Sequence, residues 1–257
     1  MIEKETKSSE DKRITCEYIG KENIRNCSDL RNKCLSDEQI YKQTHSNSYS
    51  KSDISINRLN KFYDQHLFRL SLKCQIDNKK GKTMTVILMN PSYASHMGLD
   101  DTLLNVKDYL CKLNAKCDSD FHYSYFIILN VFPIRTANSK FLECLLNKYD
   151  HNCEYRNENL NYIKTKINEG GDFILAWGAD YHKTDEAQKI LEELNNSKKT
   201  RKLVYRLNDS KGREGTPSHF TSRIYNKVKK ELQLIEVNID SIDNKLFLKK
   251  SGILLKA

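Results

Sequence analysis

Long hydrophobic runs are missing from this chain of 257 residues. No segment approaches the roughly 18 apolar residues that a transmembrane helix needs. The first residues also lack the apolar core of a secretory signal. These two absences predict a cytoplasmic protein with no membrane partner.

Closely spaced metal ligands are missing too. The eight cysteines include no Cys-x-x-Cys pair, although metal and iron–sulfur sites usually need such spacing. A metal site assembled from distant residues is the alternative; its ligands would be Cys16, Cys27, Cys34 and His45. Because thiols stay reduced in the cytoplasm, we expect free cysteines, no metal and no cofactor.

Acidic residues are outnumbered by basic ones. The chain has 43 Lys and Arg against 34 Asp and Glu, a net charge of +9, with a pI near 9.0. This excess favours nucleic acid or an anionic membrane surface as partner, although a solvated lysine-rich surface gives the same sum. The hydrophobic share of 38% is enough for a core and argues against a wholly disordered chain.

The composition changes near residue 61. Residues 1–60 are polar and are predicted to form an appendage, helical or partly disordered, before an α/β domain over residues 61–257. Short apolar runs in that domain are typical of buried parallel strands; they are residues 84–89, 125–132, 173–177 and 203–207. Residues 67–72 alternate in polarity and are predicted to form an antiparallel hairpin with the first of these strands.

Helical patterns separate the predicted strands. Asp101 or Thr102 is predicted to cap one helix, and Thr184 another. Residues 234–239 and 246–248 are strand-like and predict a peripheral ribbon. The alternation predicts a three-layer α/β/α fold with a central, mostly parallel, four-stranded sheet and peripheral antiparallel strands.

Polar loops follow the predicted strands, at the edge where ligands bind in such sheets. All three prolines, Pro91, Pro133 and Pro217, fall in these loops, where rigid turns preorganise the backbone. Ordinary strand-to-loop punctuation explains any one loop. Several such loops at one sheet edge favour a binding or catalytic site.

The loop motifs resemble those of the uracil-DNA glycosylase superfamily. Met89-Asn90-Pro91 resembles the first catalytic motif in its mismatch-specific version. Residues 127–130 and 135–139 are similar to the family's Leu-Leu-Leu-Asn strand and downstream Ala-Asn-Ser. Residues 173–179 resemble its Phe-Leu-Leu-Trp-Gly segment, and residues 216–222 its His-Pro-Ser-Pro-Leu-Ser loop. The same motifs resemble a bacterial family of unknown function, and some prokaryotic antiviral glycosylases resemble this fold.

The resemblance implies two catalytic residues. Asn90 matches the position that orients the attacking water, and a turn cap is its alternative role. His219 is expected to donate a hydrogen bond to the departing base anion. The chain departs from the family here, because Thr216 stands where the family has histidine and His219 follows three residues later. A loop without this histidine hydrogen-bond donor is therefore the alternative.

The resemblance also implies a base-binding pocket. Asn130 matches the residue that reads the edge of a flipped-out base, with one acceptor and one donor group. Ser92 stands where uracil enzymes place a tyrosine that excludes 5-substituted pyrimidines. A small residue there leaves room at C5, and Tyr93 is expected to supply the stacking wall.

DNA contacts are expected from the loop after the fourth strand. Hydroxyls and cations there match phosphate binding; the residues are Lys211, Arg213, Ser218, Phe220, Thr221, Ser222 and Arg223. Of these, Phe220 or Arg223 is expected to fill the gap that a flipped base leaves. Arg135 is expected to tie the second loop to a carboxylate, Asp100 or Asp101, in a supporting shell around the site. For the two carboxylates themselves, capping of the following helix is the favoured role.

These features together predict a monomeric, monofunctional DNA glycosylase that acts on double-stranded DNA. The expected substrate is a 5-modified pyrimidine, such as the glucosylated hydroxymethylcytosine of phage DNA, excised in antiviral defence. Repair of uracil or mismatched bases is the first alternative. A catalytically inactive DNA-binding module of the same fold is the second, and an enzyme acting on free nucleotides is the third.

Overall fold

The computed structural model of the chain describes residues 17–19, 69–91, 100–116, 122–134, 142, 153–208, 213–221, 225 and 233–256. Within these ranges, no helix is long and apolar enough to cross a membrane. Most of the predicted appendage over residues 1–60 lies outside them. Its described part, Glu17–Ile19, is strand β1, which pairs with the sheet and is not helical.

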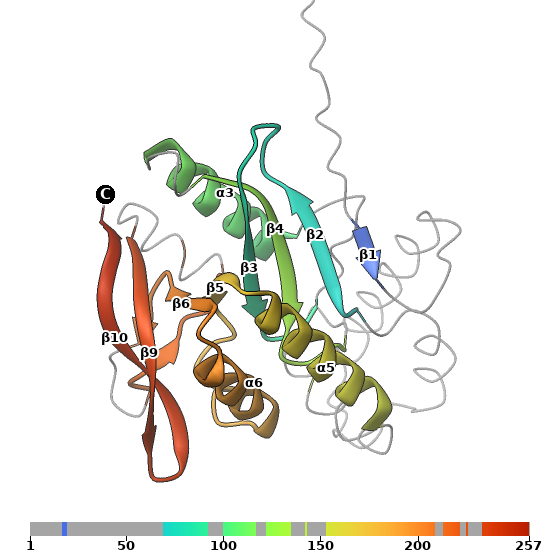
Figure 1. The fold of residues 1–257 in the computed structure, drawn as a ribbon, viewed down its shortest axis with the longest axis vertical. Helices are drawn as coiled ribbons and strands as arrows, with labels where there is room; N and C mark the ends of the chain where they lie inside the picture. Colours follow the sequence, from blue (N-terminus) through green and yellow to red (C-terminus); the bar gives the residue numbers. More distant parts are fainter. Residues whose placement is uncertain are drawn as a thin grey trace, which may run out of the picture.

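An eight-stranded sheet forms the centre of the fold (Figure 1), in the order β1-β2-β4-β3-β5-β6-β9-β10. Its four middle strands are mutually parallel, as the apolar runs predict. These strands are β4 (Tyr123–Asn130), β3 (Lys82–Leu88), β5 (Gly171–Leu175) and β6 (Thr200–Val204). Antiparallel strands flank them on both sides, so the sheet is mixed.

The predicted hairpin before the first parallel strand is wrong. β2 (Ser71–Gln75) runs antiparallel to β4, and β4 separates it from β3. The crossover from β3 brings β4 directly beside β3, so that side of β3 is already occupied. Leu72 and Cys74 of β2 are completely buried in the same core cluster as Phe126 and Ile128 of β4.

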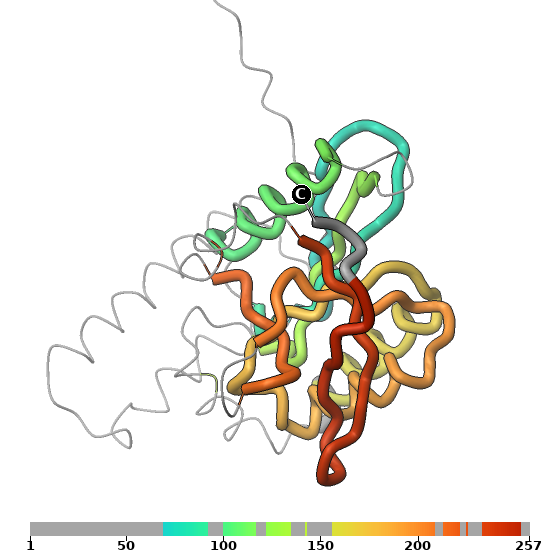
Figure 2. Tube along the Cα trace, turned by 90° about the vertical axis from the view of Figure 1, so that its left-hand side faces the viewer, coloured from blue at the N-terminus to red at the C-terminus, as the bar shows by residue number. Residues whose placement is uncertain are grey.

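Helices cover both faces of the sheet, which confirms the three-layer prediction. α3 (Asp101–Lys116) packs on one face, whereas α5 (Cys153–Glu169) and α6 (Asp185–Asn196) pack on the other. Figure 2 shows α3 on one side of the strands and α5 and α6 on the opposite side.

The capping residue of α6 is the predicted one, whereas the cap of α3 is neither Asp101 nor Thr102. Thr184 caps α6, because its hydroxyl accepts a hydrogen bond from the amide of Ala187. At α3 the cap is Asp100, whose carboxylate accepts from the amide of Leu103 at 2.9 Å. The cap predicted at Asp101 or Thr102 is therefore wrong by one residue or more, and the capping role expected for Asp100 is confirmed.

The predicted peripheral ribbon is confirmed and is longer than its sequence pattern. β9 (Gln233–Ile242) and β10 (Lys245–Lys256) form an antiparallel pair beside β6. Asp243 and Asn244 join them with φ values of 50° and 60°. Such left-handed residues make the tight turn whose twist matches a β-hairpin. Two further short strands, β7 (Leu207–Asn208) and β8 (Thr216–Pro217), pair with each other.

A buried polar clamp fixes this ribbon to α6. Gln188 donates to the carbonyl of Leu246 and accepts from its amide, at 3.3 and 2.7 Å. His182 contacts the same carbonyl through Nε2 at 2.9 Å, and its Nδ1 accepts from the Trp177 indole at 3.3 Å. Both ring nitrogens are therefore used by a neutral imidazole, and burial lowers the pKa of His182 to about 4.

A buried ionic trio lies at the amino ends of the parallel strands. Arg201 donates two hydrogen bonds to Asp172, at 2.8 and 2.6 Å, and Tyr123 donates a third at 2.5 Å. Asp172 is 8% exposed. Its charge is compensated, because a buried carboxylate is tolerated when it is paired and hydrogen-bonded. The trio ties β4, β5 and β6 together at the edge opposite the polar loops.

Candidate active site

Asn130 ends β4 at the carboxyl edge of the sheet. It is completely buried, and neither its Oδ1 nor its Nδ2 has a hydrogen-bond partner. Because side chains alternate along a strand, Asn130 faces the same side as Phe126 and Ile128, the side that α3 covers. Each unpartnered buried polar group costs about 1–3 kcal/mol. An orphaned amide at a ligand-binding edge is the signature of a site that binds something polar.

Asn90 lies on the neighbouring strand, two residues beyond the end of β3. Leu88 is paired with Asn130 in the parallel register. Beyond the strand ends, the amides of Val131 and Phe132 continue the ladder to the carbonyls of Leu88 and Met89, both at 2.9 Å. These bonds hold the two motif loops together. The Asn90 side chain is half-buried and donates to the carbonyl of Pro91 at 3.0 Å.

His219 is packed against the loop that follows β5. Gly178 has a φ of 88°, and a β-carbon built on it would lie 3.6 Å from Cβ of His219. The carbonyl of His219 accepts from the Tyr205 hydroxyl at 2.6 Å. Two elements therefore place this histidine, and both belong to the carboxyl edge of the sheet.

The three residues line up along one edge in strand order. Asn130 follows β4, Asn90 follows β3, and His219 packs on the loop after β5. Strands lie about 4.8 Å apart, so Asn130 and the Gly178 loop are separated by roughly 10 Å, with Asn90 between them. That span matches the width of a single pyrimidine with a group at each side.

His219 is neutral at physiological pH. Its Nδ1 is fully buried with no hydrogen-bond partner, although the residue keeps part of its surface exposed. Burial lowers its pKa to about 4. A neutral imidazole donates from one nitrogen and accepts at the other, so it can hydrogen-bond a developing anion without carrying a charge.

Thr216 and Ser218 have structural roles. Thr216 is 3% exposed; its hydroxyl donates to the carbonyl of Arg213 at 2.7 Å and accepts from Asn208 at 3.0 Å. Ser218 is 2% exposed and donates to Oδ1 of Asn208 at 3.0 Å. The Ser218 hydroxyl is therefore buried and used within the loop, and its contact with DNA stays a prediction.

Phe220 belongs to the core and does not lie on the surface. It is completely buried and stacks on Tyr205 with ring centroids 4.0 Å apart. Its carbonyl accepts from Asn105 of α3 at 3.1 Å. This burial does not favour the expected role of Phe220 in DNA contact or in filling the gap of a flipped base, which stays a prediction. An apolar side chain beside His219 in sequence gains more from burial under α3 than from exposure.

The remaining predicted residues divide into two groups. Arg213 is exposed and forms an ion pair with Asp180 at 3.1 Å; Thr221 and Asp101 are also exposed. The others lie outside the described residues; they are Ser92, Tyr93, Arg135, Lys211, Ser222 and Arg223.

Arg69 is a buried arginine whose charge acts on the half-buried Asp100, and the sequence does not predict its role. Burial raises the pKa of Asp100, and the positive charge of Arg69 acts against that rise. Arg69 is 1% exposed, and its amide donates to the carbonyl of Pro133 at 2.9 Å. It thus joins the start of β2 to the loop after β4. A lone arginine before a strand carries no sequence signal for this role.

Among the described residues, no group of three His, Cys, Asp or Glu side chains converges as metal ligands do. The site consists of amides, an imidazole and backbone groups. Such a set binds neutral polar groups through directional hydrogen bonds.

The fold and this edge define a mixed α/β protein with a polar ligand-type site at the carboxyl ends of its parallel strands. A family model described as "Protein of unknown function (DUF1643)" matches residues 69–219, more than half of the chain. The chain therefore belongs to this family, and the expected likeness to a family of unknown function is confirmed. No curated protein and no solved structure matches the chain. The matched span begins at Arg69 and ends at His219, so it contains the whole edge described above.

Proposed function

We propose that this protein is a monofunctional DNA glycosylase with a uracil-DNA-glycosylase-like fold. One observation carries the proposal: the Asn130 amide is buried at the carboxyl edge without a partner for either polar atom. One acceptor and one donor group, fixed side by side, complement the Watson–Crick edge of a pyrimidine. A base inside a duplex is out of reach, so the nucleotide must flip out.

The other two residues supply the chemistry. Asn90 positions the attacking water at the anomeric carbon; an amide is a weak base, so its contribution is orientation. The bond between base and sugar breaks through an oxocarbenium-like state, and the electron pair leaves with the base; water then bonds to the anomeric carbon, and the proton that it releases passes to solvent. His219 donates a hydrogen bond to that anionic base, and its neutral form suits this role because its proton stays on the ring.

The substrate is proposed to be a pyrimidine with a substituent at C5. The argument comes from the sequence, because Ser92 is small where uracil enzymes place an excluding tyrosine. Removal of such bases from phage DNA leaves abasic sites that block replication, which points to antiviral defence.

The test compares three duplexes for alkali-labile abasic sites. One duplex contains uracil, one contains unmodified cytosine, and one contains glucosylated hydroxymethylcytosine. The Asn90→Ala and Asn130→Leu variants are expected to lose base release by at least about 100-fold. Asn168→Ala is the matched control, because Asn168 is an exposed asparagine near the far end of α5.

Each outcome separates one reading from another. Release only from the modified duplex supports the proposal as stated. Release from uracil alone keeps the mechanism and moves the protein to repair. Tight, salt-sensitive DNA binding without any abasic site refutes the proposed glycosylase activity and favours a DNA-binding module of the same fold.

A further inference from the structure

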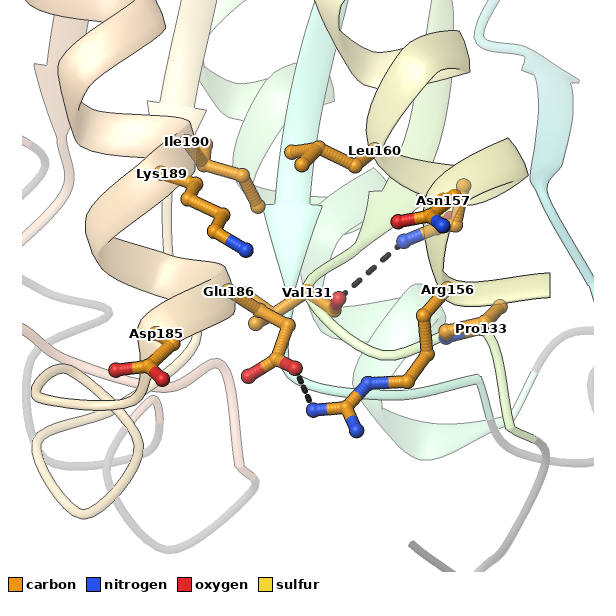
Figure 3. Close-up of a pocket in the computed structure, with 10 residues that line it drawn as sticks. Val131, Pro133, Arg156, Asn157, Leu160, Asp185, Glu186, Lys189 and Ile190 are labelled. Atoms are coloured by element: carbon orange, nitrogen blue, oxygen red, sulfur yellow. Dashed lines mark hydrogen bonds and ion pairs between the residues drawn. The ribbon is translucent and has the colours of Figure 1, made fainter. Parts of the chain in front are cut away.

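A second pocket lies on the other face of the sheet, between the first turns of α5 and α6 (Figure 3). Its volume is about 220 Å³. Pockets for drug-sized ligands measure about 300–1,000 Å³, so this one suits a molecule the size of a single ring. It begins at Val131, the residue after Asn130, and no role in the proposed base chemistry uses it.

The formal charges of the side chains that line the pocket sum to zero. Arg156 and Lys189 contribute two positive charges, and Asp185 and Glu186 contribute two negative ones. Figure 3 shows Arg156 of α5 and Glu186 of α6 joined by an ion pair. Asp185 and Glu186 also offset the positive end of α6, since both lie in its first turn. A phosphate or a metal cation is therefore disfavoured, and a neutral ligand is favoured.

The remaining lining is part apolar and part amide. Val131, Pro133, Leu160 and Ile190 supply the apolar surface, and none of the ten lining residues is aromatic. A nucleobase would find no ring to stack on, whereas a sugar needs only modest apolar contact and many hydrogen bonds. Paired carboxylates, a guanidinium, an ammonium group and two amides provide those bonds in both directions.

Asn159 connects the pocket with the end of β4. It lines the pocket and is 2% exposed. Its Nδ2 donates to the carbonyls of Asn130 and Val131 at 2.9 and 3.2 Å. A ligand in the pocket would therefore lie beside the residue that holds the main chain of Asn130.

We propose that the pocket between α5 and α6 binds one monosaccharide-sized neutral sugar. Two sources share this chemistry: a free monosaccharide, and the hexose attached to a glycosylated pyrimidine in DNA. The first source is independent of the proposed glycosylase, and the second rests on it. Asn159, which lines this pocket, also holds the main chain of Asn130.

The experiment uses the full chain and two probes. Methyl glucoside tests the free sugar by ligand-observed NMR. Duplexes with glucosylated or unglucosylated hydroxymethylcytosine test the base-linked sugar by fluorescence anisotropy. Asn157→Trp fills the pocket from an exposed lining position, and Asn168→Trp is the matched control on the same helix, outside the lining.

We expect Asn157→Trp to weaken binding of the sugar-bearing probe by at least about tenfold, with Asn168→Trp within about twofold of the unmodified protein. If Asn157→Trp loses affinity for methyl glucoside, the pocket binds a free sugar. If it loses affinity only for glucosylated DNA, the pocket binds the sugar linked to the base. The proposal is overturned if methyl glucoside does not bind and glucosylated DNA binds no more tightly than unglucosylated DNA. It is also overturned if Asn157→Trp changes the affinity for neither probe. Base release from unglucosylated hydroxymethylcytosine is measured in parallel, so a failed glycosylase and a failed sugar site give different results.

Discussion

Replacement of Asn130 by leucine should make the protein more stable. The amide is completely buried, and neither polar atom has a partner. At about 1–3 kcal/mol for each unpartnered group, the two atoms cost roughly 2–6 kcal/mol. Leucine has a similar size and needs no partner, but its methyl groups do not match the amide's shape, which costs about 1–3 kcal/mol.

The balance predicts a gain of about 2 kcal/mol in the free energy of unfolding. For a domain of this size, that gain raises Tm by roughly 4–8 °C. Urea denaturation followed by circular dichroism measures the free energy, and a thermal scan measures Tm. The same variant should lose base release, because a group kept at a cost in stability is kept for binding.

Asn208→Leu is the matched control with the opposite sign. The Asn208 amide donates to the hydroxyl and carbonyl of Thr216 and to the carbonyl of Pro217, and it accepts from Ser218. Its loss should lower the free energy of unfolding by about 3 kcal/mol. A loss of similar size for Asn130→Leu would refute the reasoning, because it would mean that the Asn130 amide is satisfied in solution.

Three more predictions follow from buried groups. Asp172→Ala should lower the free energy of unfolding by about 1–3 kcal/mol in urea denaturation, because it removes the acceptor of the buried Tyr123 hydroxyl and of two Arg201 hydrogen bonds, while base release per folded molecule stays unchanged at the opposite edge. Gly178→Ala should cost about 1–2 kcal/mol through its φ of 88°, and relief of that strain should slow base release by shifting the loop against which His219 packs, since the methyl itself lies at ordinary contact distance; an unchanged melting curve contradicts this. His182 and His219 have pKa values lowered to about 4 from 6.5, so the unfolded chain binds more protons between those values. Stability should therefore be full above pH 6.5 and should fall towards pH 4, by about 3 kcal/mol for each histidine; a urea midpoint that stays constant over this window contradicts the burial of both rings.

The sequence predicted the parallel sheet and its helices because local patterns specify them. Four apolar runs became β4, β3, β5 and β6, and the apolar faces of α3 and α6 are buried as their periodicity requires. The pairing partner of β2 was not predictable in this way. Its alternation fits any neighbour, and the choice depends on where the crossover places β4.

The sequence predicted at which edge of the sheet the candidate site lies, but not which of its loop residues are buried. Asn90, Asn130 and His219 do reach one edge, because parallel strands end together. The burial of Phe220 and Ser218 was not predicted, because a sequence does not show whether a loop residue faces solvent or the underside of a helix. Arg69 and Asn159 were missed, because their roles depend on contacts with the loop after β4, far away in sequence.

The clamp on β10 bears on where this family's folding unit ends. The matched span stops at residue 219, but Gln188 and His182 inside it complete their hydrogen bonds on Leu246 outside it. A fragment cut at the end of the match would leave those groups unpaired and would open the β6 edge to another chain. Recombinant fragments should therefore extend through β10, and shorter ones should precipitate. The span shared by relatives and the span that folds alone are two different lengths of chain.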